Sequence, residues 1–149
     1  MFQRLIATAP TWMTMPLRIA LGVIFIAHGA QKVFGIWDGP GLNAFIANRG
    51  NPVPFGLAPA WLWMGSAAFA ELIGGLLVLV GLFTRLGALM IVPVMLVAIF
   101  GVSWGGFFLP KGFEYALVLL CIAFALVFAG GGRLSVDEKL MHSRGRRRR

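Results

Sequence analysis

The hydrophobic pattern along the chain consists of four long apolar stretches, which are separated by short polar or Gly- and Pro-rich breaks. A bilayer core of about 30 Å requires roughly 20 residues of helix, at about 1.5 Å per residue. Each stretch approaches this length, so the pattern predicts an all-α membrane protein, a bundle of four transmembrane helices. The predicted helices cover residues 16–36, 60–83, 86–108 and 112–130.

The breaks between these stretches predict how the helices are connected. Asp38 to Gly41 form a turn signal after the first helix, and residues 37–59 are expected to form an external loop with a short amphipathic segment. Only Thr84 and Arg85 separate the second and third helices, which are therefore expected to be antiparallel neighbours. Pro93 predicts a kink in the third helix.

The composition supports lipid as the solvent of most of the chain. Hydrophobic residues make up 59% of the 149 positions and charged residues 12%, whereas water-soluble domains carry about 25% charged residues. The single cysteine, Cys121, excludes an intramolecular disulfide and a C-x-x-C redox pair. The start of the chain has no small-x-small cleavage site after its apolar stretch, so this stretch is expected to be a retained first helix.

The basic residues predict the orientation. Ten of the 13 lysines and arginines fall on the side of the termini, and Lys32, Arg49 and Lys111 fall on the other, so both termini are expected on the cytoplasmic side of the membrane. The net charge of +8 does not indicate nucleic-acid binding, because much of it lies in a tail rather than on a folded face. The expected organisation is a transmembrane domain over residues 1–134 and a basic cytoplasmic tail over 135–149, either simply solvated or in contact with anionic lipid headgroups. The ten residues on the side of the termini are Arg4, Arg18, Arg85, Arg133, Lys139, Arg144 and Arg146 to Arg149.

A few ionisable residues within the apolar stretches are the candidates for chemistry, because charged groups are costly in a bilayer and face the interior of a bundle. His28, Gln31 and Lys32 share one face of the first helix. Glu71 shares its face of the second helix with small residues, which directs its carboxyl group at a neighbouring helix. Glu71 is expected to be either a carboxylate paired with His28 or Lys32, or a neutral acid. The alternative is that these polar groups only hold the helices together.

Aromatic and motif signals narrow the chemistry further. Trp61 and its neighbours suit either a headgroup belt or the wall of a cavity for a flat apolar molecule such as a quinone. The sequence has no G-x-G-x-x-G, P-loop or C-x-x-C motif, and His142 lies in the tail, so neither a haem nor a metal site is expected. A redox role would therefore place the electron-carrying cofactor in another subunit.

Three segments resemble the DoxX family of small membrane proteins. They are the segment Leu17 to Gly35 with its H-G-x-Q-K pattern, the segment Ala70 to Leu89 with E-L-I-G-G followed by T-R, and the segment Gly112 to Leu120 with GGGRLSVD over Gly130 to Asp137. The resemblance implies a four-helix inner-membrane protein that acts as an oxidoreductase or quinol-oxidase-type subunit. The Arg-rich end is not part of the family pattern.

The leading functional hypothesis is a membrane subunit of an oxidoreductase system that binds a quinone. Glu71 and His28 are the expected catalytic residues, and no metal or covalently held cofactor is expected. A proton-coupled transporter and a scaffold that recruits a soluble redox enzyme are the alternatives, and the expected partners are lipid, a soluble redox subunit and further copies of the chain. The expected ligand-binding residues are Gln31, Lys32, Glu114, Tyr115 and Trp61.

Overall fold

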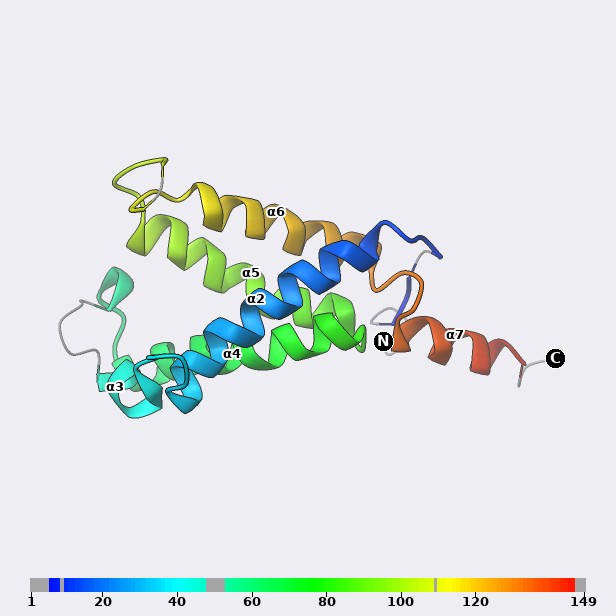
Figure 1. Ribbon diagram of the computed structural model, residues 1–149, viewed down its shortest axis with the longest axis horizontal. Helices are drawn as coiled ribbons and strands as arrows, with labels where there is room; N and C mark the ends of the chain where they lie inside the picture. The colour runs from blue at the N-terminus through cyan, green and yellow to red at the C-terminus, as the bar shows by residue number, and fades with distance from the viewer. Residues whose placement is uncertain (1–5, 9, 48–52, 109, 147–149) are drawn as a thin grey trace.

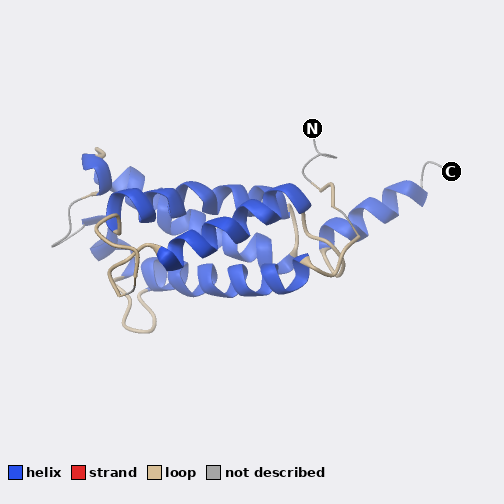
Figure 2. Cartoon of the chain, turned by 90° about the horizontal axis from the view of Figure 1, so that it is seen from above, coloured by secondary structure: helices blue, strands red, loops and turns tan. Residues whose placement is uncertain are grey.

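The computed structural model describes residues 6–8, 10–47, 53–108 and 110–146. Arg4, Arg49 and Arg147 to Arg149, which contributed to the predicted orientation, lie outside the described residues, as does part of the predicted external loop. The described residues form six α-helices, one short 3-10 helix and one π-helical segment, and no strand (Figures 1 and 2). The prediction of an all-α fold is therefore confirmed for this part of the chain.

The helices correspond to the predicted apolar stretches with small shifts at their ends. Glycines set two C-termini, because α2 and α4 stop where Gly35 and Gly81 adopt positive φ angles. Three helices are long and apolar enough to cross a membrane, namely α2, α4, and α5 with its π-helical extension, while α6 is a shorter apolar helix of 16 residues. The long elements are α2 (Thr14–Phe34), α4 (Ala60–Val80), α5 (Thr84–Val97) with η2 (Ala98–Val102), and α6 (Glu114–Ala129).

The prediction that the third helix extends to Phe108 is wrong at its C-terminal end. Helix α5 continues through Pro93, changes to the π-helix at Ala98 and stops at Val102. The following residues form a loop because Gly105 and Gly106 favour turns and the nearby aromatic rings stack on one another. This loop closes when the backbone N–H of Glu114 donates to the Phe107 carbonyl over 3.0 Å.

The four apolar helices pack side by side around a common core. Helix α2 contacts α4 and α6, and α5 contacts α4 and α6, so the neighbours in space are α2, α4, α5 and α6 in that order (Figure 1). Helices α4 and α5 are antiparallel neighbours, as the short break between them predicts. The most deeply buried apolar side chains of the core, each exposed by at most 1%, are Leu21, Phe25, Val78, Ala88, Ile91, Ala123 and Leu126.

Small residues allow α2 and α4 to approach closely. A Cβ atom at Gly29 would lie 2.5 Å from the backbone nitrogen of Leu72, and one at Gly75 would lie 2.8 Å from that of Ile26. Gly74 meets α5 in the same way, where its Cβ would be 3.0 Å from the carbonyl oxygen of Gly87. The small-residue face of α4 therefore contacts two helices, as its sequence predicts.

The connections gather at two opposite ends of the bundle. The turn between α4 and α5 and the helix α7 (Val136–Arg146) lie at one end, together with the N-terminal end of α2 (Figure 1). The short helix α3 (Gly41–Ala47), the 3-10 helix η1 (Pro54–Gly56) and the loop after η2 lie at the other end (Figure 1). We refer to these as the tail end and the loop end.

Candidate functional site

An ion pair joins α2 to α4 in the half of the bundle toward the loop end. The ammonium group of Lys32 donates a hydrogen bond to Oε2 of Glu71. The Glu71 side chain is 6% exposed and that of Lys32 is 22% exposed, so the carboxylate is buried and the ammonium reaches the edge of the bundle. Of the two expected partners of Glu71, the structure selects Lys32.

The position of this pair follows from the close packing of α2 and α4. Gly29 lies one turn before Lys32, and it brings the α2 backbone against Leu72, the residue after Glu71. The short helix α3 covers the pair, because the ring of Phe45 lies 5.6 Å from the Lys32 nitrogen in a cation–π contact. The pair is thus enclosed by three helices.

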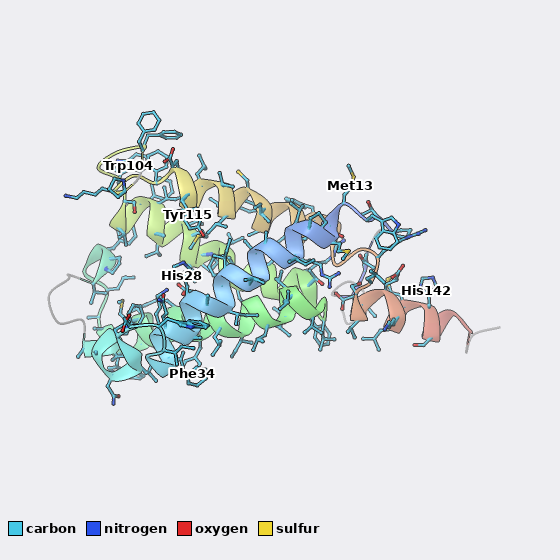
Figure 3. The ribbon with its side chains drawn as sticks, viewed as in Figure 1. Met13, His28, Phe34, Trp104, Tyr115 and His142 are labelled. Carbon is cyan, nitrogen blue, oxygen red and sulfur yellow. The ribbon has the colours of Figure 1, made fainter. Side chains whose placement is uncertain are left out.

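A cavity of about 270 Å³ lies beside the ion pair, between α2, α4, α5 and α6. The two predicted catalytic residues, Glu71 and His28, contribute to its polar lining, together with polar residues from distant parts of the sequence. Figure 3 shows His28 on α2 and Tyr115 on α6, and both residues line the cavity. The remaining wall is mainly apolar. The polar side chains that line the cavity are His28, Lys32, Glu71, Ser103 and Tyr115.

The structure therefore brings together four of the seven predicted site residues, namely His28, Lys32, Glu71 and Tyr115. The described residues include no hydrogen bond between His28 and Glu71, so the alternative in which His28 pairs with Glu71 is not formed. The imidazole of His28 instead forms part of the cavity wall.

Three predicted site residues lie outside the cavity wall. The side-chain amide of Gln31 donates to the carbonyl oxygen of Trp37 over 3.2 Å, so it stabilises the turn after α2. Trp61 is 62% exposed at the start of α4, as expected for a residue of a headgroup belt. Glu114 begins α6, one residue before Tyr115, and does not line the cavity. Sequence spacing placed these residues near the site but could not give their direction.

A second polar cluster, at the tail end, was not predicted from the sequence. Arg18 is 5% exposed, and its guanidinium group donates to main-chain carbonyls of two segments. Its Nε bonds the carbonyl of Val78 over 3.1 Å, and its Nη1 bonds that of Gly131 over 3.0 Å. Arg18 therefore ties the ends of α2 and α4 to the segment that follows α6.

The carboxylate of Asp137 completes this junction. It is 1% exposed and accepts hydrogen bonds from the backbone nitrogens of Phe83 and Thr84, over 2.8 and 2.9 Å, and from the Thr84 hydroxyl over 2.8 Å. Asp137 thus supplies the N-terminal cap of α5 from a distant part of the chain. The junction runs past residue 134, the predicted domain boundary, and the GGGRLSVD pattern was its signal in the sequence.

The two clusters differ in what they can do chemically. Every polar atom that is described for Arg18 and Asp137 is directed at a main-chain or hydroxyl partner, so the tail-end cluster is a structural junction. The loop-end cluster borders a cavity and contains a carboxylate, an ammonium, an imidazole and a phenol. These groups can bind and protonate a small polar head. No group of three or more metal-ligating side chains occurs in the described part of the chain.

Comparisons with known proteins identify the family of this chain. The sequence profile of the DoxX family matches residues 13–104. An uncharacterised protein of Haemophilus influenzae is 31% identical over 123 residues, and this match covers 81% of this chain and 78% of the length of the relative. A Bacillus subtilis protein named "Putative oxidoreductase CatD" is 33% identical over 125 residues, and this match covers 83% of this chain and 84% of the length of the relative. No solved structure matches. The profile and both relatives cover most of the apolar helices, and the chain is a membrane protein of the DoxX family.

Proposed function

We propose that this protein is the membrane subunit of an oxidoreductase system and that it binds a quinone headgroup in the cavity beside Lys32 and Glu71. The observation that carries the proposal is the buried Glu71 carboxylate, which is paired with Lys32 and borders a cavity shared with His28 and Tyr115. Polar groups within bilayer depth are costly, and here they converge on one space from three helices. The name of the Bacillus subtilis relative supports the same class of activity.

The size and lining of the cavity suit a compact ring. A volume of about 270 Å³ is just below the range of about 300–1,000 Å³ that drug-sized ligands occupy. The mostly apolar wall matches the faces of a flat ring, and the polar groups match carbonyl oxygens at its edges. His28 and Tyr115 lie on facing helices, so each is suited to donate a hydrogen bond to one of two opposite quinone oxygens.

Reduction of the quinone to a quinol takes two electrons and two protons. The electrons come from a soluble redox enzyme that docks on the membrane subunit, and the protons pass through the side chains at the cavity. The Lys32 ammonium is suited to give one proton to a reduced oxygen, and Glu71 stabilises the ammonium before the transfer. Tyr115 is suited to deliver the second proton to the opposite oxygen, while His28, on the same helix as Lys32, donates a hydrogen bond to the first oxygen. Lys32 and Tyr115 then regain their protons from water.

The proposed topology places the cavity in the outer half of an inner membrane. Helices α2, α4, α5 and α6 each cross the bilayer, and the extension η2 compensates for the short α5. Arg18, Arg85 and Arg133 lie at the tail end, which is cytoplasmic by the positive-inside rule. Lys32 and Lys111 lie toward the loop end, on the periplasmic side.

Equilibrium binding of a quinone to the protein in lipid nanodiscs tests the proposal. We expect saturable binding to the wild type and at least a tenfold loss of affinity in Glu71→Gln and His28→Ala. Each substitution removes about 1.4 kcal/mol or more of the binding free energy of the quinone headgroup. Trp61→Ala is the matched control, because Trp61 lies in the same half of the bundle but outside the cavity. An unchanged isotherm in both site variants would leave Glu71 and His28 with a purely structural role.

A further inference from the structure

A second cavity, of about 410 Å³, lies between α4 and α5 at the loop end, and the proposed headgroup site does not use it. Its wall is apolar, apart from Ser66, whose hydroxyl already donates to the carbonyl of Trp63 over 2.9 Å. Such a wall can hold a hydrocarbon chain and offers nothing to a polar head. We call it the α4–α5 groove. Its lining on the two helices includes Met64, Ala67, Ala70, Met90, Pro93 and Val97.

The groove exists because α4 and α5 separate toward the loop end. The two helices touch at Gly74 and Gly87, where a Cβ on Gly74 would be 3.0 Å from the Gly87 carbonyl oxygen. From there they diverge along their length (Figure 1). Ala67 and Ala70 leave space on the α4 side, and Pro93 lies on the α5 side.

The loop that precedes α4 forms part of the groove wall. Val53, Pro54 and Leu57 line it from this loop. Pro54 and Phe55 are held against the π-helix, because a Cβ on Gly101 would lie 2.8 Å from the Cβ of Pro54. The groove is therefore walled by this loop as well as by α4 and α5.

The groove and the polar cavity share one lining residue. Val94 lines both spaces, and Glu71 on the polar side directly follows Ala70 on the apolar side. A ring in the polar cavity with a substituent directed past Val94 would place that substituent in the α4–α5 groove. The two spaces together match a molecule with a polar ring and one long apolar chain.

We infer that the α4–α5 groove holds the isoprenoid tail of the quinone, so that the ligand class is a prenylated, membrane-dissolved quinone rather than a water-soluble one. This inference rests on the proposed function. It also makes the seam between α4 and α5 the route by which the ligand passes between lipid and cavity. The tail is surrounded by apolar groups both in lipid and in the groove, so its transfer into the groove adds little hydrophobic free energy. The groove therefore acts by positioning the tail.

Photo-crosslinking tests the location of the tail directly. The full-length protein in nanodiscs of a single phospholipid receives a quinone that carries a diazirine on the second isoprene unit, and mass spectrometry locates the attached residues. We expect crosslinks to Met64, Met90 and their neighbours on α4 and α5, which excess unlabelled prenyl quinone removes. Ala67→Phe fills the groove and should reduce these crosslinks about tenfold, while Ile73→Phe, which places the same phenyl side chain on the 44%-exposed outer face of α4, should not.

The other outcomes separate failure of the inference from failure of the proposed function. Saturable quinone binding with crosslinks only to α2 or α6 would overturn the inference and leave the proposed function standing. Equal labelling of the groove by a diazirine phospholipid, unaffected by excess prenyl quinone, would show an ordinary lipid site and overturn the inference as well. If neither a prenylated nor a tail-less quinone binds the wild type saturably, the proposed function fails, and the inference fails with it.

Discussion

The ion pair between Lys32 and Glu71 makes a quantitative prediction about stability. Removing one partner of a buried pair costs about 3–5 kcal/mol, since the other charge stays buried without compensation. Lys32→Met leaves the Glu71 side chain, which is only 6% exposed, so we expect a loss near 3 kcal/mol. Glu71→Met leaves Lys32, which is 22% exposed and can reach water or headgroups, so we expect about half that loss.

The double variant Lys32→Met/Glu71→Met carries the test. Two unbranched apolar side chains replace the pair at similar length, so we expect a stability within about 1 kcal/mol of the wild type. Reversible unfolding in mixed micelles, measured for all four proteins, gives the coupling energy. If the losses of the two single variants simply add in the double variant, Lys32 and Glu71 do not stabilise each other, and the account of the site is wrong.

Three further predictions concern the frame around the site. Gly29→Ala should destabilise the protein by about 1–3 kcal/mol in the same unfolding assay, because the new Cβ would meet the Leu72 backbone at 2.5 Å, whereas Gly105→Ala, with open space around it, should have little effect. Asp137→Ala should cost about 2 kcal/mol, because it removes the cap of α5 and its hydrogen bonds to the N–H groups of Phe83 and Thr84; a thermal midpoint equal to that of the wild type would contradict the assigned cap. A chain truncated after residue 134 lacks Ser135 and Asp137, so it should be at least as destabilised as Asp137→Ala. A chain truncated after residue 146 should keep the wild-type unfolding midpoint. Equal midpoints for the two truncated chains would refute the junction.

The sequence predicted the helices well where one physical signal dominated. Apolar length located all four apolar helices, although α2 and α4 end at Phe34 and Val80, before the predicted ends at residues 36 and 83. The C-terminal end of the third was misplaced, because the prediction gave the turn signal of Gly105 and Gly106 less weight than the aromatic side chains among residues 103–108. Their loop depends on ring stacking, such as that of Trp104 on Phe113 at 5.6 Å, which hydrophobicity does not encode.

The candidate site was predicted only in part, for a related reason. The cost of charge in lipid singled out Lys32 and Glu71, and helical spacing placed His28 and Lys32 on one side of α2. Spacing could not choose between His28 and Lys32 as the partner of Glu71, because that choice depends on the close contact of α2 with α4. The role of Arg18 was missed because it counted as a topology signal, whereas its partners are carbonyl groups about 60 and 113 residues away in the chain.

Identification of the small molecules that co-purify with the protein tests the central claim most directly. The wild type and Glu71→Gln would be purified in mild detergent from the same native membranes, and bound molecules would be quantified by mass spectrometry. The account predicts a prenylated quinone in the wild type, near one per protein chain, and its loss from Glu71→Gln. Equal amounts of quinone in both proteins, or none in either, would contradict the claim that the Lys32–Glu71 cavity binds a quinone headgroup.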